Sequence, residues 1–195
     1  MKLIDIVKIG EEKAAAIAAK AVLKGEVIVV PTDTVYGLAA DAANRKAVSK
    51  VFKVKSRKPG KPLPIFVKNI AMAKKVARIS ARQERVMRLS WPGKATFVVY
   101  SKGTLAQETG TLQTIGLRQP NHSFLALLLE KTGRPLTGTS ANLAGKAPIG
   151  EGKRAKEVFK NRKEKPSYIF DMGKLPASSP SSVVDITKSK ARTIR

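Results

Sequence analysis

The chain has 195 residues, of which 43% are hydrophobic, which is enough for one domain with a buried core and too little for two full domains. It contains no cysteine, which excludes a disulfide framework, a thiolate nucleophile and a thiolate metal site, and which fits a reducing cytosol. Its 38 Lys and Arg residues against 14 Asp and Glu give a net charge of +24, which favours anionic partners.

The positive charge is unevenly distributed along the chain. No acidic residue occurs between Asp41 and Glu84, although lysines and arginines are frequent there. Such a field attracts phosphate-bearing ligands and nucleic acid, because each neutralised phosphate releases counterions. The alternative is an ordinary solvated basic face. Neither a signal peptide nor a membrane-spanning stretch is evident, so we expect a cytoplasmic protein without membrane contact.

The first half of the chain predicts alternating helices and strands. An Ala-rich helix that ends at Gly25 precedes a buried strand stopped by Pro31, and a helix with one apolar stripe follows. A proline-rich break then leads to a strand and to two short helices that meet near Ser80. The predicted helices are Glu11–Lys24, Asn44–Lys55 and the pair within Ile70–Leu89, and the predicted strands are Glu26–Val30 and Leu63–Val67.

The second half predicts more strands than helices. A leucine-rich helix over Ser123–Lys131 should bury Phe124 and Leu125, Leu127, Leu128 and Leu129, and a partly helical, mobile basic segment covers Gly150–Arg162. The predicted strands are Ala95–Tyr100, Thr114–Leu117, Pro135–Thr139, Tyr168–Phe170, Ser182–Ile186 and Ala191–Ile194. The alternation indicates an α/β fold, and the late strands favour a mixed sheet.

Four separated segments carry small hydroxyl or cationic side chains beside β-branched runs. This is how an α/β protein presents polar groups at the end of a sheet, and four such segments in a short chain predict one site for an anionic substrate. The segments are PTDTVYGL at Pro31–Leu38, KSR at Lys55–Arg57, GTSAN at Gly138–Asn142 and SSVVD at Ser181–Asp185.

The polar residues in these segments favour a reaction that is catalysed by positioning of the substrates and by charge neutralisation. HExxH, Walker A and GxGxxG motifs are absent, and the only histidine, His122, is expected to start a helix. Lys, Arg, Thr, Ser and Asn side chains suit phosphoryl or nucleotidyl transfer.

The motifs together resemble those of the YrdC/TsaC family of threonylcarbamoyl-AMP synthases. The resemblance runs in order from about Gly25 to Arg195 and rests on PTDTVYGLAADA, K-x-R with Pro62-Leu63, WPG with Thr96, GLRQPNH, TSANLAG and SSVVDIT. It implies a single domain over 1–195 with a twisted mixed sheet, flanked by helices and curved around a basic concave cavity, as in the YrdC/RibB type of fold. It also implies synthesis of threonylcarbamoyl-adenylate and pyrophosphate from L-threonine, bicarbonate and ATP with Mg²⁺. Downstream threonylcarbamoyl-transferase proteins would use that product to modify tRNA.

The resemblance also assigns roles to individual residues. Lys55 and Arg57 form a catalytic clamp for carbamate and phosphates, in which Arg supplies a bidentate fork and Lys a compact charge. Arg57, Lys61, Thr114, Ser140, Asn142 and Arg195 match ATP-binding positions, and Thr34, Arg118 and Ser181 match threonine-binding positions. We expect Asp33, Asp41 and Asp185 to cap turns, with no metal held by protein side chains.

Each role has a structural alternative. Thr34 can simply close a strand, Ser140 and Asn142 can satisfy turn amides, and the K-x-R cations can be solvated surface charges that contribute little to folding. Phe66 stands where many family members have histidine, which bears on threonine selectivity. Lys146–Lys165 is a candidate closing segment, and its later basic residues fall outside the matched motifs.

Other functions are compatible with the same fold. A non-catalytic protein that binds tRNA or double-stranded RNA by its phosphates is the main alternative, and the two activities can coexist. A further alternative is a carbamoyl-transfer enzyme of the hydrogenase-maturation type.

Overall fold

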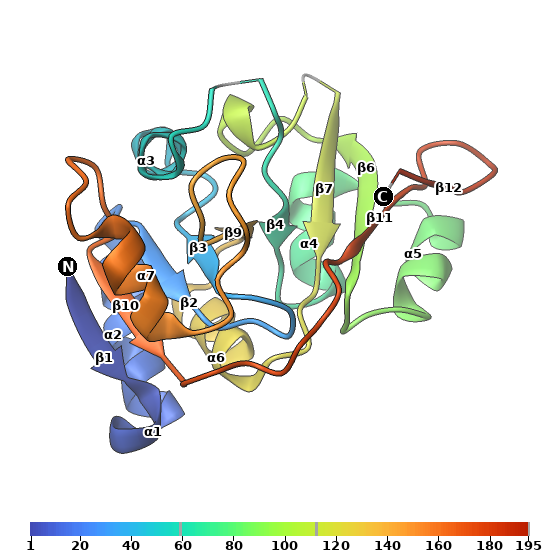
Figure 1. Cartoon of the computed structure of the whole chain (residues 1–195). Helices are drawn as coiled ribbons and strands as arrows, with labels where there is room; N and C mark the ends of the chain where they lie inside the picture. The colour runs from blue at the N-terminus through green and yellow to red at the C-terminus, as the bar shows by residue number, and fades with distance from the viewer. Residues whose placement is uncertain (59, 112, 195) are drawn as a thin grey trace.

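Two mixed β-sheets lie side by side in the computed structural model, which describes residues 1–58, 60–111 and 113–194 (Figure 1). The first has five strands in the order β1-β10-β2-β3-β9, and the second has the order β12-β11-β6-β7-β4-β8 with β5 paired to β6. Parallel and antiparallel pairs occur in both sheets, which confirms the predicted mixed α/β fold.

The first sheet is built from residues at both ends of the chain. Its strands are β1 (Lys2–Asp5), β2 (Ile28–Val30), β3 (Gly37–Ala39), β9 (Thr139–Ser140) and β10 (Tyr168–Asp171). The helices associated with it are α1 (Ile6–Ile9), α2 (Glu11–Leu23), α3 (Arg45–Lys55), α6 (Ser123–Thr132) and α7 (Gly152–Phe159).

The second sheet carries the middle of the chain. Its strands are β4 (Ile65–Phe66), β5 (Ala77–Arg78), β6 (Ala95–Ser101), β7 (Thr114–Arg118), β8 (Leu136–Thr137), β11 (Ser182–Asp185) and β12 (Arg192–Thr193). The short helices α4 (Ile70–Val76) and α5 (Ala81–Arg88) share its core, and a 3₁₀ turn, η1, spans Gln107–Thr109.

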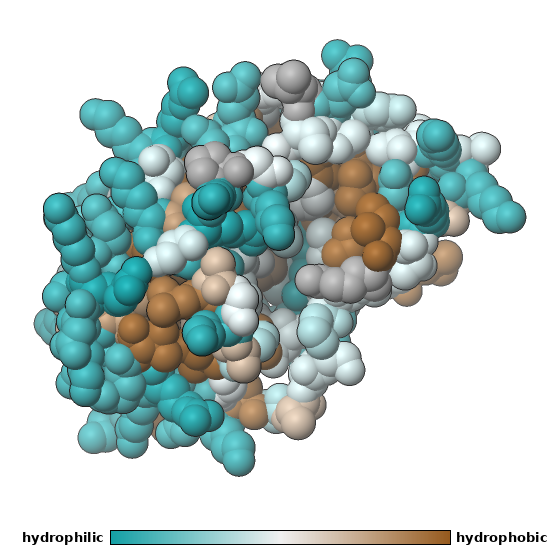
Figure 2. All heavy atoms as spheres, turned by 45° about the horizontal axis from the view of Figure 1, so that its top comes forward, coloured by the Kyte–Doolittle hydropathy of each residue, from teal (hydrophilic) through white to brown (hydrophobic). Residues whose placement is uncertain are grey.

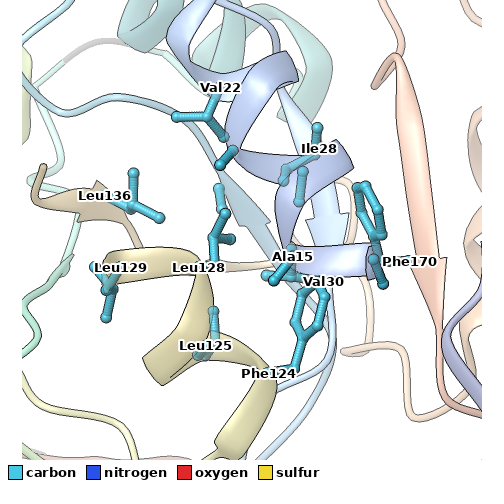
Figure 3. Packing of buried hydrophobic residues seen from close by; sticks show 14 of the residues in the cluster. Ala15, Val22, Ile28, Val30, Phe124, Leu125, Leu128, Leu129, Leu136 and Phe170 are labelled. Atoms are coloured by element: carbon cyan, nitrogen blue, oxygen red, sulfur yellow. The ribbon is translucent and has the colours of Figure 1, made fainter. Parts of the chain in front are cut away.

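Strand β2 has an apolar cluster on each of its two faces. Alternation along the strand sends Ile28 and Val30 into one cluster and Val29 into the other. The small alanines of α2 let it approach α6 closely over the first face, as Figure 3 shows. Helices α3 and α7 contribute to the cluster on the opposite face, so the first sheet is covered on both sides.

The predicted helices form with the expected ends. Glycine in the left-handed region at Gly25 ends α2, and Asn44 caps α3 by accepting a hydrogen bond from Ala47 N. Ser80 and Gln83 form a capping box that starts α5, so the break near Ser80 is confirmed. Leu127, which was expected to point inward, is only partly buried.

Four features differ from the prediction. The strand predicted over Pro135–Thr139 is two strands in different sheets, because the chain leaves β8, donates Gly138 N to Pro64 O at 2.7 Å, and enters β9. Strand β1 and helix α1 were not predicted, and neither was β5, a two-residue strand. Strands this short are stabilised by pairing with residues that are distant in the sequence, and the local hydrophobic pattern does not predict such pairing.

No helix in the described part of the chain combines the length and apolar character that crossing a membrane requires.

We predict that Gly138→Ala destabilises the protein. A Cβ at this position would lie 2.7 Å from ring atoms of Phe66, which is 2% exposed and belongs to the core. Overpacking of this kind costs about 1–3 kcal/mol, to be measured as a lowered urea midpoint with an unchanged slope. Gly150→Ala is the matched control, because nothing lies within 4 Å of its Cβ position. Equal midpoints for the two variants would contradict the proposed close contact.

Candidate functional site

Lys55 is a buried cation at the C-terminal end of α3. It continues the helical stripe of Val48, Val51 and Phe52 by one turn, so its stem enters the core and only 4% of the residue is exposed. Burial, and secondarily the charge of Arg57, lowers the pKa of Lys55 to about 8. The alternative that this lysine is a solvated surface charge is therefore wrong.

The Lys55 ammonium organises the turn after β9. Its Nζ donates to Ser140 O at 2.6 Å, to Asn142 O at 3.1 Å and to Asn142 Oδ1 at 2.7 Å, and it lies 3.3 Å from Ser140 Oγ. Ser140 Oγ also donates to Asn142 Oδ1 at 2.6 Å, and Asn142 Nδ2 donates to Lys146 O. The structure thus brings Lys55 together with two predicted site residues that lie 85 and 87 positions away in the sequence, and we call Lys55, Ser140 and Asn142 the lysine cluster.

Arg57 lies beside the lysine cluster with part of its guanidinium buried. Its Nη2 donates weakly to Pro62 O at 3.3 Å, while its Nε is buried and has no hydrogen-bond partner among the described residues. Burial lowers the pKa of Arg57 from its ordinary value. A buried N–H without an acceptor costs free energy, so this group is suited to an anionic ligand.

A second group of polar residues surrounds Arg118 at the end of β7. Arg118 Nη2 lies 2.6 Å from Asp33 Oδ1, and the two side chains are only 5% and 9% exposed. Arg118 Nε donates to Gly93 O at 3.0 Å, and its guanidinium carbon lies 5.9 Å from the centre of the Phe66 ring. This pair is the centre of what we call the arginine cluster.

Hydroxyl groups complete the arginine cluster. Strands β6 and β11 run parallel and bring Thr96 Oγ1 within 3.3 Å of Ser181 Oγ. In the loop after β2, Thr34 is 6% exposed, and its hydroxyl lies 3.0 Å from that of Thr32. Thr34, Asp33, Thr96, Arg118 and Ser181 therefore form a set of buried polar side chains on loops and strand ends.

Two of the predicted ATP-binding residues, Lys61 and Thr114, lie outside both clusters. Lys61 is exposed, and Thr114 begins β7, four residues before Arg118, with its hydroxyl 2.9 Å from that of Thr111. Arg195 lies outside the described residues. Lys61 follows the K-x-R loop, and Thr114 lies at the opposite end of its strand from the arginine cluster.

The aspartates have defined partners. Asp41 accepts from Ala43 N at 2.9 Å, and Asp185 accepts from Thr187 N at 2.8 Å, as expected for turn caps. Asp33 instead forms the ion pair with Arg118 and accepts from Asn121 N at 3.2 Å, a role that we had not predicted. No group of three potential metal-ligating residues is present in the described ranges.

His122 occupies the N-cap position of α6, as predicted, but its side chain makes no capping bond. Its Nδ1 is buried and without a partner in the described part of the chain. Burial lowers its pKa, against the opposing influence of Glu11 and Asp33.

An aromatic ring lies between the two clusters. The Phe66 ring lies under Arg118 and also against Gly138, which directly precedes β9 and the lysine cluster. The face seen in Figure 2 is hollowed near its middle, with hydrophilic side chains along much of the rim.

The segment after α7 contacts the K-x-R loop. Arg162 Nη2 donates to Ser56 Oγ at 2.7 Å, and Ser56 is the one non-glycine residue in the described chain with a left-handed φ, at 51°. The basic residues of this segment fall outside the matched motifs in the sequence, but Arg162 contacts one of those motifs in the fold.

We predict that Lys55→Met lowers the free energy of unfolding by about 2 kcal/mol at pH 7, because it leaves buried acceptors without a donor. The deficit should grow between pH 8 and 10.5, since the lowered pKa makes the unfolded wild type bind more protons than the folded form over this interval. Urea unfolding across this pH range tests both effects, with Lys53→Met, an exposed lysine on the same helix, as the control. A deficit that shrinks with rising pH, or an equal loss in the control, would contradict the assignment.

A family model described as Sua5_yciO_yrdC, telomere recombination, matches residues 20–195. The threonylcarbamoyl-AMP synthase of Pseudoalteromonas translucida is 32% identical over 184 residues, which cover 92% of this chain and 97% of that protein. The threonylcarbamoyl-AMP synthase of Pyrococcus abyssi is 32% identical over 180 residues, which cover 91% of this chain but only 52% of the longer relative. The crystal structure of P. abyssi Sua5 with L-threonine superposes over 100% of this chain and 56% of that one, with a TM-score of 0.90 at 28% identity.

Proposed function

Because this chain belongs to the Sua5/YciO/YrdC family, we propose that it is a threonylcarbamoyl-AMP synthase. The observation that carries the proposal is the pairing of a lysine cluster with an arginine cluster through Phe66 and Gly138. Two adjacent polar sites suit a reaction that joins a nucleotide to a small amino acid. The relative crystallised with L-threonine supports the amino-acid half of the proposal.

The proposed reaction has two bond-forming steps. The threonine amine nitrogen attacks the carbon of bicarbonate, and loss of water leaves a carbamate. A carbamate oxygen then attacks the α-phosphorus of ATP, and pyrophosphate leaves. Neither step needs a protein nucleophile. The protein has to hold threonine, bicarbonate and ATP close together, with the carbamate oxygen in line with the α-phosphorus.

The lysine cluster and Arg57 are the proposed nucleotide side of the site. Arg57 has a buried N–H that needs an acceptor, and its planar fork can bind carbamate and phosphate oxygens together. Lys55 would neutralise the negative charge of carbamate and phosphates at close range. It also holds Ser140 and Asn142 in place through its hydrogen bonds. Lys61, Thr114 and Arg195 are proposed to contact the nucleotide at the edges of this region.

The arginine cluster is the proposed threonine side. Among the described residues, two of the five N–H groups of Arg118 donate to Gly93 and Asp33, so the others can bind a carboxylate. Thr34 and Ser181 would supply hydroxyls to the polar atoms of threonine. The buried pair with Asp33 holds the guanidinium plane in one orientation before the substrate arrives.

Mg²⁺ is expected to enter with ATP. The aspartates near the motifs are engaged by Arg118, Ala43 and Thr187, and the described residues offer no cluster of three metal-ligating side chains. The protein therefore fits poorly as the main holder of the ion, and phosphates and water are its natural ligands.

We further propose that 1–195 act as one catalytic domain, because β8 and β9 are consecutive yet lie in different sheets. The product is a reactive mixed anhydride, which downstream transferase proteins would pass to tRNA. The protein would therefore work with those proteins and with tRNA.

Threonine and bicarbonate together, and neither alone, should make the protein convert ATP with Mg²⁺ into an adenylate and pyrophosphate. Mass spectrometry of the reaction mixture identifies threonylcarbamoyl-adenylate directly. Absence of that product from a folded protein that still binds RNA would favour the non-catalytic alternative.

Arg57→Ala should reduce turnover by about 10²–10³, the usual loss when a preorganised donor to developing charge is removed. Its thermal midpoint should stay near that of the wild type, since its one protein hydrogen bond is exposed and long. Lys58→Ala is the matched control, because Lys58 is an exposed cation next to Arg57 in sequence. Near-normal turnover in Arg57→Ala, or a comparable loss in Lys58→Ala, would remove Arg57 from the site.

A further inference from the structure

A basic groove lies away from both clusters, at the outer edge of the second sheet. It has a volume of about 800 Å³ and is lined by residues from α4, β5, the start of α5, the end of β6 and the turn after β11. In Figure 1 this is the region between α5 and the loop that leads to β12. None of its described lining residues belongs to the lysine or arginine cluster.

The groove is lined by cations and by no acid in the described chain. Its five cations are Lys74, Arg78, Arg82, Lys102 and Lys188. Lys74 is paired with Glu84 at 2.5 Å, whereas Arg78 and Lys188 have no ion pair among the described residues. Asp185, the acid that influences Lys188, accepts hydrogen bonds from Thr187 N and Oγ1. The groove therefore keeps a large positive excess.

The walls of the groove are fixed by side chains that reach across it. Arg82 donates from Nη1 to Ser189 O at 2.7 Å and from Nη2 to Lys188 O at 2.5 Å, which clamps the turn after β11 to α5. Gln83 Nε2 donates to Ile186 O at 2.7 Å beneath this clamp. Lys102 Nζ donates to Lys74 O at 2.6 Å and fastens the end of β6 to α4. The shape is therefore formed before any ligand binds.

One aromatic ring is available beside the free cations. Tyr100 is 44% exposed, and it is the direct cross-strand partner of Arg78 in the β5–β6 pair. Such partners have neighbouring side chains on one face of a sheet. An exposed ring next to an unpaired guanidinium provides a surface on which a nucleobase stacks while its phosphate meets a positive charge.

We propose that this groove binds a single-stranded segment of nucleic acid. The five cations come from separate elements around the groove, and several separated charges match a row of phosphates better than one phosphate group. Duplex nucleic acid hides its base faces and would leave Tyr100 unused, and an acidic peptide has no base to stack. Tyr100 lies four residues from Thr96 along β6, about 13 Å, so a bound strand would pass near the arginine cluster without filling it.

The test is fluorescence anisotropy of the full chain with a labelled oligouridylate of about 12 nucleotides, which lies within the range of about 4–16 nucleotides that single-strand-binding domains contact. Tyr100→Ala should weaken binding about tenfold, within the range for loss of one stacked base, while Tyr100→Phe should bind like the wild type. Melting curves of both variants exclude unfolding as the cause.

A salt titration isolates the phosphate contacts. The double variant Arg78→Gln/Lys188→Gln should lower the slope of log affinity against log salt by about 1.4, or about 0.7 for each lost phosphate contact. Lys8→Gln/Lys13→Gln is the matched control, because these lysines are exposed on α1 and α2 and do not line the groove. Adenylate synthesis should be unchanged in all of these variants, which keeps this test separate from the proposed function.

Three outcomes would overturn the proposal. An RNA duplex of equal length that competes better than the single strand would indicate recognition of duplex shape. Polyglutamate that competes equally well, with Tyr100→Ala unaffected, would indicate an acidic protein segment. Equal salt slopes for the groove and control double variants would show that the groove makes no phosphate contact.

Discussion

A single buried ammonium sets the geometry of the candidate site. Lys55 donates to two main-chain carbonyls and one side-chain amide of the turn after β9, so it joins the end of α3 to the first sheet. Burying a cation costs solvation free energy, and its lowered pKa reports that cost. A neutral residue of similar size would avoid the cost, but it could not orient the same acceptors or place positive charge beside Arg57. The hydrogen bonds to these buried acceptors offset that cost, so the ammonium fixes the arrangement without a net loss of stability.

In the arginine cluster a buried cation, Arg118, again orients its neighbours. Arginine keeps its charge when buried, and its planar fork can serve Asp33, Gly93 and a ligand at the same time. The relative position of the two clusters depends on Phe66 and Gly138. Gly138 lies where the chain crosses from one sheet to the other, and its lack of a side chain lets the Phe66 ring pack against it. A small displacement at this crossing would change the distance between the proposed nucleotide and threonine sides.

Local patterns in the sequence predicted α2, α3 and α6 well, because each has an apolar stripe and a recognisable end. The burial of Lys55 had a signal, since it continues the stripe of Val48, Val51 and Phe52. The division of Pro135–Thr139 into two strands had only the weak signal of Gly138.

Other features lacked a local signal. The pairing of Asp33 with Arg118 joins residues 85 positions apart, and that of Ser56 with Arg162 joins residues 106 positions apart. Contacts of this kind depend on the tertiary fold and leave no periodic trace in the sequence. The basic groove is similar, because its cations come from separate elements whose adjacency only the sheet topology creates.

The two clusters are proposed to bind different substrates. Calorimetric titration of L-threonine and of ATP into two variants, Arg118→Lys and Arg57→Ala, tests this proposal most directly. Arg118→Lys keeps the charge but loses the fork, so it should weaken threonine binding by about tenfold or more and leave ATP binding nearly unchanged. Arg57→Ala should instead weaken ATP binding and leave threonine binding nearly unchanged. Equal loss of both ligands in both variants would contradict two separate clusters and indicate one undivided anion site.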